Sequence, residues 1–509
     1  MPRSALVRGF TAVLMLGTGL TGLAALTAPA AQAALPAPDS VRMARVTDDA
    51  VMVRWDEVAG ATGYVLQHAD SVDGRFTTIA TTGQRTVYAT HTGVDTTKAH
   101  YYRVQTLEGD QRSIPSEPTV ASLSAPAASL PDGGVIDLDF GPGEVKVGAT
   151  RINANSAWGP GQRIGFVHTA RVKGTDRRTD DPVRGDFVTV GDTELVIDVP
   201  NGDYGVDVVA GDAEGPTDIG MTVEQMAKVA RTTKAAGEFL ETGFDIAVVD
   251  GQINIEFAGD AANLSSLVIT KKAERDAGEE PTLWITGDST VQTYGASVAP
   301  QAGWGQMFDR YLTDDVTVTN RSIGGRSSKN FISQGRLDSV LLNIRPGDYL
   351  FSQFGHNDNS YGVDDRYAAP ADYKEYLRTF VDGARQRGAT PVIVTPVSRR
   401  DYNADGTAKV SFPAYVDAAR ELAAETDALL VDLSASSRAY LTEIGAEEAK
   451  KVFLWVEPGV YPNRPNGTQD NTHFQEYGAV QMARLVATDV AAFDDPLAGE
   501  VEGLDAASS

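Results

Sequence analysis

The strongest constraint on the fold is the alternation of short apolar runs with amphipathic stretches that begins after Pro281. The apolar runs predict strands at 282–286, 316–319, 348–354, 391–395 and 429–432. The stretches between and after them predict helices at 371–387, 413–426 and 476–493. Such a repeat predicts an α/β domain with a parallel, doubly wound sheet. Reactive groups in these folds lie at the carboxyl ends of the strands, so we expect the chemistry in the loops that follow them.

The chain before Pro281 has a different pattern. Short runs with period-two alternation, separated by Gly and Asp turns, fill residues 36–123 and predict an antiparallel β-sandwich. Runs of the same kind between 135 and 270 predict a second all-β sandwich. An Ala-, Ser- and Pro-rich segment at 121–134 and a charged segment at 271–281 mark the expected boundaries.

The first 33 residues are expected to be a targeting segment. Arg3 and Arg8 precede an apolar run at 10–26, and Ala31-Gln32-Ala33 follows it. Basic residues, an apolar run and an A-x-A site are typical of a secretory signal peptide. We therefore expect a secreted, extracellular protein with a bacterial-type signal. No later segment is apolar over the length that a membrane span requires, so no membrane partner is expected.

Composition excludes several classes of function. The chain of 509 residues has 44 Lys and Arg against 69 Asp and Glu, and the resulting net charge of -25 is spread along it. Nucleic acid is therefore not an expected partner, because phosphate binding needs clustered cations. The chain has no cysteine, which rules out disulfides, thiolate metal sites and a cysteine nucleophile. Metalloprotease and phosphate-loop motifs do not occur, and we expect no metal and no cofactor. The oligomeric state is open.

Residues suited to acyl transfer follow the predicted strands. Ser289 lies in Gly287-Asp288-Ser289-Thr290 after the first of them, where we expect helix-start amides near its hydroxyl. A serine nucleophile needs a base, and the base needs a carboxylate to hold its tautomer. His473 and Asp470 are three residues apart, near enough for one loop to present both.

An acyl-transfer site also needs donors for the oxyanion. The backbone amides of Ser289 and Gly325 and the side-chain amide of Asn357 could supply them. Gly325 lies in the loop 322–327 and Asn357 in the loop 355–358, each after a predicted strand. The sequence therefore contains every part of a serine hydrolase site.

These motifs resemble the four blocks of the SGNH (GDSL-type) hydrolases. The blocks are Gly287-Asp288-Ser289, Gly325, Gly355-x-Asn357-Asp358 and Asp470-x-x-His473, in family order. Segments 324–328, 354–358 and 470–479 are similar to the rhamnogalacturonan acetylesterase branch. The resemblance implies that Ser289 is the nucleophile, His473 the base and Asp470 its orienting carboxylate. It also implies an oxyanion hole of Ser289, Gly325 and Asn357.

Weaker resemblances cover the β-rich half. Trp55, Tyr64 and Tyr101-Tyr102-Arg103-Val104 are similar to a fibronectin type III module, which has no chemistry of its own. Asp139-Phe140-Gly141-Pro142-Gly143 and Trp158 resemble a galactose-binding-like jelly roll, which either binds sugar or only packs against its neighbour. The predicted order is a signal peptide (1–33), a fibronectin type III-like sandwich (36–123), a galactose-binding-like sandwich (134–272), an SGNH catalytic domain (281–495) and an acidic tail (496–509).

Each site residue has an alternative explanation. Asp470 could cap the last helix, His473 could be a surface histidine, and Asn357 could stabilise a turn. His356 could shape the pocket or contact substrate.

Three residues are candidates for substrate binding: His356, Arg326 and Tyr294. Arg326, together with Lys329, Arg399 and Arg400, could pair with galacturonate carboxylates. These cations could equally be solvated or paired with acids of the chain, namely Asp358, Asp401 or Asp405. Tyr294 could stack on a sugar, whereas Trp304 is expected in the core.

The motifs favour a secreted serine esterase that acts through an acyl-enzyme. The resemblance implies that it removes acetyl groups from a plant cell-wall polysaccharide, pectin or rhamnogalacturonan. An acetylated polysaccharide is the expected partner. One alternative is an esterase of acetylxylan or small acyl esters, because the triad leaves the alcohol open. An alternative of another class is a non-catalytic polysaccharide-binding protein.

Overall fold

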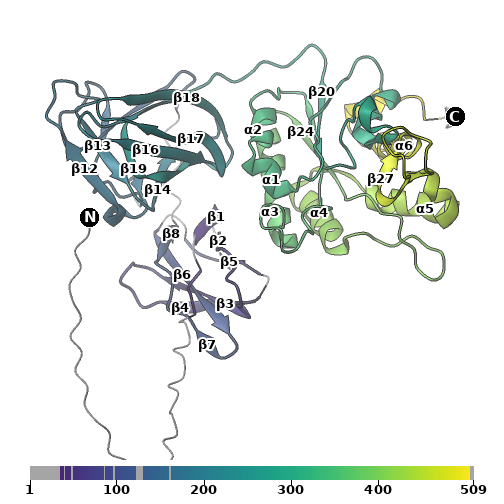
Figure 1. Ribbon diagram of the computed structural model, residues 1–509, viewed down its shortest axis with the longest axis horizontal. Helices are drawn as coiled ribbons and strands as arrows, with labels where there is room; N and C mark the ends of the chain where they lie inside the picture. The colour runs from purple at the N-terminus through teal and green to yellow at the C-terminus, as the bar shows by residue number, and fades with distance from the viewer. Residues whose placement is uncertain are drawn as a thin grey trace, which may run out of the picture.

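A computed structural model describes residues 35–38, 41–46, 50–84, 86–95, 98–121, 130–159 and 162–504. The predicted signal peptide, residues 122–129 of the first boundary and the end of the predicted tail lie outside the described residues. Two β-rich units are followed by an α/β unit (Figure 1). None of the helices in the described part of the chain has the length and hydropathy to cross a membrane.

The first β unit consists of two antiparallel sheets. One contains β1 (Arg42–Val46), β2 (Ala50–Arg54) and β5 (Tyr88–Thr92). The other contains β3 (Gly63–Ala69), β4 (Thr77–Gly83), β6 (His100–Glu108), β7 (Gln111–Arg112) and β8 (Thr119–Ala121). Trp55 and Tyr64 are buried in the unit's core, with ring centroids 5.6 Å apart. The apolar faces of its alternating strands therefore pack on one another, as the sequence pattern predicts.

The second β unit is built around one long strand, β19 (Gln252–Lys271). The other strands are β9 (Val135–Phe140), β10 (Thr150–Ile152), β11 (Ile164–Phe166), β12 (Val172–Asp176), β13 (Asp186–Val190), β14 (Glu194–Asp198), β15 (Gly202–Gly211), β16 (Thr217–Val223), β17 (Met226–Lys234) and β18 (Phe239–Val248), with the 3-10 turn η1 (Thr169–Arg171). The first half of β19 pairs with β14 and β16, and its second half pairs with β9, β13 and β15. One strand therefore joins both layers, around a core that includes Phe140, Phe166 and Tyr204.

The α/β unit has a five-stranded parallel sheet with the order β22-β20-β23-β24-β25. Its strands are β20 (Thr282–Gly287), β22 (Thr317–Asn320), β23 (Tyr349–Gln353), β24 (Thr390–Val394) and β25 (Leu429–Val431). Each end differs from the predicted one by at most one residue. The predicted doubly wound fold, preceded by all-β units, is thereby confirmed.

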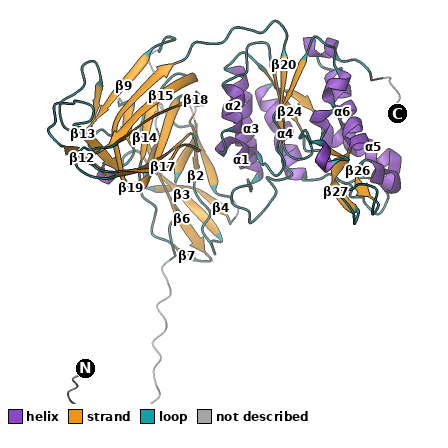
Figure 2. Ribbon diagram, turned by 45° about the horizontal axis from the view of Figure 1, so that its top comes forward, coloured by secondary structure: helices purple, strands orange, loops and turns teal. Residues whose placement is uncertain are grey.

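Helices cover both faces of this sheet (Figure 2). One face carries α1 (Ser328–Ser333), α2 (Arg336–Leu341), α3 (Pro370–Arg385) and α4 (Pro413–Thr426). The other carries α5 (Leu433–Glu448) and α6 (Glu476–Val490). The 3-10 turns of the unit are η2 (Ala296–Val298), η3 (Trp304–Gln306), η4 (Phe308–Tyr311), η5 (Ala449–Lys451) and η6 (Pro496–Glu500). A separate antiparallel sheet contains β21 (Gln301–Ala302), β26 (Phe453–Val456) and β27 (Thr468–Gln475).

The start of the predicted acidic tail packs on the α/β unit. Residues 496–500 form η6, in which Leu497 is buried in the core. The Thr313 hydroxyl donates to Glu500, and the Glu502 amide donates to the Tyr311 carbonyl at 3.0 Å. The unit therefore continues beyond residue 495 to at least 502.

A buried ion-pair cluster joins the second β unit to the α/β unit. Asp203 on β15 accepts from Arg387, 2.5 Å away, and from Arg275. Arg275 belongs to the charged segment 271–281, and its guanidinium also donates to the Leu341 and Ile344 carbonyls. The charges that mark the predicted boundary therefore hold two units together.

Replacing Asp203 with alanine should destabilise the protein by about 3–5 kcal/mol, because Arg387 would remain buried without its counter-charge. The midpoint of urea unfolding of the full chain measures this effect. Asp207→Ala is the matched control, since Asp207 is an exposed acid on the same strand and should cost less than about 0.5 kcal/mol. Equal midpoints for the two variants would contradict the assigned role of the cluster.

Candidate active site

Ser289 lies in a tight turn at the carboxyl end of β20. The Val291 amide donates to the Asp288 carbonyl at 3.2 Å, and no helix begins there. The expectation of helix-start amides beside Ser289 is therefore wrong. A side chain on Gly287 would approach the Gln353 carbonyl to 2.8 Å, so only glycine fits between the two strands.

Asp470 and His473 lie on strand β27 and not in the loop that we expected. In its pairing with β26, Phe474 faces Phe453 and Gln469 faces Trp455, so residues 470–473 stand opposite a single residue. In a regular strand, side chains three apart point to opposite faces. The bulge removes this restriction and lets Asp470 and His473 meet.

A chain of hydrogen bonds connects the three residues of the predicted triad. His473 Nδ1 is 2.6 Å from Asp470 Oδ2, and His473 Nε2 is 2.9 Å from Ser289 Oγ. Asp470 Oδ1 accepts the amides of Thr472 and His473 at 2.7 and 3.1 Å. Helix α6 begins at Glu476 after Gln475, so Asp470 does not cap it.

These hydrogen bonds keep Asp470 ionised. Burial alone would raise the pKa of its carboxyl, but donation from the His473 ring and from the two amides outweighs burial and lowers the pKa to about 2. Both side chains remain partly accessible, with exposed fractions of 29% for His473 and 27% for Asp470. A substrate can therefore reach the imidazole and the serine.

Hydrogen bonds link the loop of Gly325 to the turn after Ser289 and the loop of Asn357 to the loop of Gly325. The Gly324 amide donates to the Gln292 side chain, three residues after Ser289. Gly325 has φ = +77°, in the left-handed region that favours glycine. The Asn357 amide nitrogen donates to the Arg326 carbonyl at 3.0 Å, and its second N–H remains for another acceptor.

Asp358, the last residue of the block Gly355-x-Asn357-Asp358, is a positioning residue whose role the sequence did not predict. One oxygen accepts the Ser328 amide at 3.0 Å and its hydroxyl at 2.5 Å, and the other accepts the Gly355 amide at 2.9 Å. Burial raises the pKa of this carboxyl to about 7, although the three donors favour the ionised form. Asp358 thereby fixes the loop of Asn357 to the start of α1, which follows the loop of Gly325.

Replacing Asp358 with asparagine should disturb both loops, because an amide accepts on one side only and leaves Gly355 or Ser328 without an acceptor. We expect a loss of about 1–3 kcal/mol in unfolding free energy. We also expect kcat for an ester to fall by up to about 100-fold, since small misplacements of catalytic groups have effects of this size. Urea unfolding and initial rates measure the two effects. An unchanged kcat in the folded variant would contradict the positioning role.

The three candidates for substrate binding already have partners within the protein. His356 is buried, donates from Nε2 to the Val397 carbonyl and packs on Phe412, and burial lowers the pKa of its imidazole. The Tyr294 hydroxyl donates to the Ser289 carbonyl at 2.8 Å, and burial raises its pKa to about 12. Arg326 donates to Gly324 and Gln334. Their contact with substrate stays a prediction.

Arg399 is a cation whose charge interacts with Asp288 and with the triad carboxylate of Asp470. Its guanidinium stacks on Phe412 at 4.6 Å. Burial lowers the pKa of Arg399, and this effect outweighs the negative charges of Asp288 and Asp470, which raise the pKa. Arg400 donates to the Ala446 carbonyl and stacks on Trp455, while Lys329 donates to the Asp364 carbonyl. Trp304 is fully buried, in agreement with its expected place in the core.

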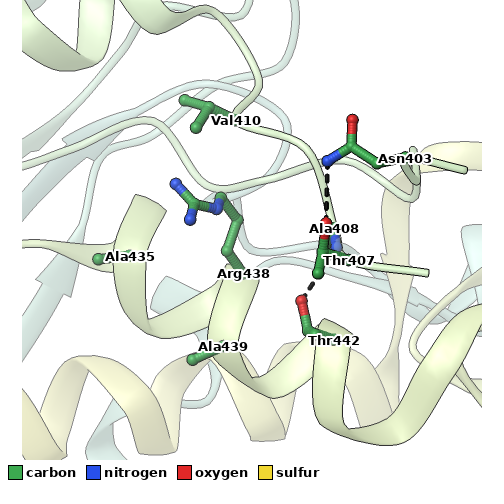
Figure 3. A pocket seen from close by; sticks show the side chains of 8 residues that line it. All are labelled: Asn403, Thr407, Ala408, Val410, Ala435, Arg438, Ala439 and Thr442. Carbon is green, nitrogen blue, oxygen red and sulfur yellow. Dashed lines mark hydrogen bonds between the residues drawn. The ribbon is translucent and has the colours of Figure 1, made fainter. Parts of the chain in front are cut away.

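A separate hollow of about 470 Å³ lies between helix α5 and the loop before α4 (Figure 3). Its lining residues are Asn403, Thr407, Ala408, Val410, Ala435, Arg438, Ala439 and Thr442. They include no imidazole, no carboxylate and none of the candidate site residues. The candidate active site is therefore the triad, despite the size of this hollow.

Comparison with known proteins identifies relatives of the α/β unit. The GDSL-like Lipase/Acylhydrolase family matches residues 285–478. Rhamnogalacturonan acetylesterase RhgT of Bacillus subtilis is 40% identical over 215 residues, which are 42% of this chain and 91% of that protein. Probable rhamnogalacturonan acetylesterase YesY of the same organism is 43% identical over 216 residues, 42% of this chain and 94% of that protein.

A crystal structure of protein YxiM from Bacillus subtilis is 28% identical and covers 70% of this chain and 98% of that one, with a TM-score of 0.37. The chain spans nine-tenths or more of RhgT and of YesY. This chain therefore belongs to the GDSL-like lipase/acylhydrolase family, as an esterase whose C-terminal α/β unit is related to rhamnogalacturonan acetylesterases.

Proposed function

We propose that the protein is a secreted serine esterase that removes acetyl groups from rhamnogalacturonan in pectin. The observation that carries the proposal is the continuous hydrogen-bonded chain from Asp470 through His473 to Ser289. The names of the relatives RhgT and YesY support the polysaccharide substrate. The basic and apolar pattern of residues 1–33 supports export from the cell.

Acylation begins when Ser289 Oγ attacks the acetyl carbonyl carbon and passes its proton to His473 Nε2. Asp470 accepts the Nδ1 proton, which holds this tautomer and stabilises the imidazolium. The tetrahedral intermediate collapses as the bond to the sugar oxygen breaks and Nε2 donates its proton to that oxygen. The products of this half-reaction are acetyl-Ser289 and a free sugar hydroxyl.

Deacylation repeats these steps with water as the nucleophile. His473 Nε2 takes a proton from water, the hydroxide attacks the acetyl carbon, and Ser289 regains its proton as acetate leaves. In both halves the oxyanion accepts from the backbone amides of Ser289 and Gly325 and from the second N–H of Asn357. Nothing in this route requires a metal or a cofactor.

Arg399 gives the site its preference for an acidic polysaccharide in this proposal. A net charge of -25 repels a polyanion at long range, so a cation close to the triad is needed to retain one. Arg399 is such a cation, because its interaction with Asp288 and Asp470 places it within electrostatic reach of both. Its guanidinium could pair with a galacturonate carboxylate next to the acetylated residue.

Acetate release tests the proposal. The purified protein is incubated with acetylated rhamnogalacturonan, acetylated homogalacturonan, acetylxylan and a chromogenic acetate, beside Ser289→Ala. Release from rhamnogalacturonan that requires Ser289 supports the proposal. Release from acetylxylan or from the small ester alone would agree with the esterase activity but contradict the assignment of a pectic substrate. Binding of polysaccharide without serine-dependent release would favour the non-catalytic alternative.

A further inference from the structure

Three of the six histidines of the chain gather at one end of the first β unit. His68 lies on β3, Asp70 follows this strand, and His100 opens β6. Asp70 lies just beyond the end of β3, and its carboxylate approaches His68 Nε2 to 3.7 Å, so the two side chains project to the same side. Ala69 pairs with Tyr101, which places His100 beside Asp70.

The ligand atoms of these side chains form a compact triangle. His68 Nε2 lies 2.9 Å from His100 Nδ1, and Asp70 Oδ1 lies 3.7 and 3.9 Å from the same two nitrogens. A point at equal distance from three atoms so spaced is about 2.1 Å from each, which is the length of a Zn–N or Zn–O bond. The triangle therefore has the size of a three-ligand metal site.

The hydrogen bonds around the imidazoles prepare His100 Nδ1 as a ligand. His100 Nε2 lies 2.8 Å from the Asp95 carbonyl, which can only accept, so this nitrogen carries the proton. The lone pair of His100 is then on Nδ1, the atom inside the triangle. A ligating histidine commonly donates its other N–H to a carbonyl in this way, which fixes the ring orientation.

The contact between the two histidines also requires an uncharged ring. Two imidazole nitrogens 2.9 Å apart share one proton, so the ring of His100 is neutral and the proton lies on His68 Nε2, from which Zn²⁺ displaces it on binding. His91 packs on His68 in a tilted arrangement with ring centroids 4.6 Å apart, and its Nδ1 lies 3.0 Å from the Tyr102 hydroxyl. His91 therefore supports the ring of His68 from outside the triangle.

We propose that His68, His100 and Asp70 form a Zn²⁺ site in the first β unit. Two imidazoles with one carboxylate are a typical donor set for zinc, whereas Mg²⁺ and Ca²⁺ prefer oxygen ligands. The Asp70 side chain is 90% exposed, so water completes the coordination. The ion ties the end of β3 to the start of β6 and stabilises a unit that has no disulfide.

Calorimetry of the full mature chain tests this site. The protein is treated with a chelator, dialysed, and titrated with ZnCl2 in excess MgCl2, which occupies weak carboxylate sites. We expect one saturable Zn²⁺ per chain and a melting temperature that rises with Zn²⁺. Asp70→Asn and His68→Gln should weaken binding at least about tenfold. Asp73→Asn, in an exposed acid of the same turn, should bind like the wild type.

Two results would overturn the site: no saturable Zn²⁺ binding by the wild type, or unchanged binding by the folded Asp70→Asn protein. Either result would leave the histidines as a hydrogen-bonded cluster of the β unit. Asp70 is exposed, so its replacement should not prevent folding. Ester hydrolysis by Asp70→Asn should equal that of the wild type, which separates this test from that of the proposed esterase.

Discussion

Replacing Ser289 with alanine should lower kcat for ester hydrolysis by about 10⁵- to 10⁶-fold, the effect seen when a triad nucleophile is removed. The reason is chemical, because His473 Nε2 then faces a methyl group and no acyl-enzyme can form. Initial rates with a chromogenic acetate measure the loss. Mass spectrometry of the quenched wild-type reaction should find acetyl on the peptide that contains Ser289, and find none in the variant.

The matched control is Ser297→Ala, a serine that is exposed in the turn η2 of the same unit. It should retain the wild-type kcat. Thermal unfolding of Ser289→Ala should resemble that of the wild type, since only one partly exposed hydroxyl is lost. A folded Ser289→Ala protein with more than a tenth of wild-type activity would rule out Ser289 as the nucleophile.

The strands of the α/β unit could be predicted because each carries its signal locally. β20, β23 and β24 are nearly continuous apolar runs, as expected of strands buried on both faces of a parallel sheet. Helices α3 and α4 show their apolar faces in the sequence and begin with proline, a favoured first residue. The secondary structure of these elements is therefore determined mainly by their local sequence.

Strand β27 could not be predicted, because its sequence TQDNTHFQ has neither apolar alternation nor β-branched enrichment. It becomes a strand by pairing with β26, which precedes it in the chain, and with β21, which comes from a distant part of the chain. Helix α5 was missed for a related reason, since it buries few side chains and contains a non-helical residue at Gly445. Tertiary contacts decide the structure at both places.

The candidate site residues also divide into those with a local sequence signal and those that only tertiary contacts bring together. The candidate triad and oxyanion residues could be found from short motifs, since each motif is local. The role of Asp358 and the proposed zinc ligands could not be found in this way, because they depend on pairs of residues that lie far apart in sequence. Asp358 accepts from Ser328, 30 positions away, and His68 meets His100 across 32 positions. No spacing rule connects such residues before the strands are placed.

Replacing Asp470 with asparagine should lower kcat by about 10⁴-fold through the tautomer of His473. The side-chain carbonyl of the new asparagine can still accept the hydrogen bonds from the amides of Thr472 and His473. The NH2 group of the asparagine then points toward His473 Nδ1. The imidazole must then accept on Nδ1 and carry its proton on Nε2, where it can no longer take the proton of Ser289. Binding of the ester does not involve this proton, so KM should change little.

Initial rates from pH 4 to 8 distinguish this mechanism from a general loss of charge. The pKa of Asp470 is about 2, so the wild-type carboxylate is ionised over the whole range, and its stabilising effect would be lost only as the pH falls toward 2. The deficit of Asp470→Asn should therefore be present at every pH from 4 to 8. Asp314→Asn, which removes an exposed acid of the same unit, should retain full activity. A deficit below tenfold in Asp470→Asn would show that His473 keeps its tautomer without this carboxylate.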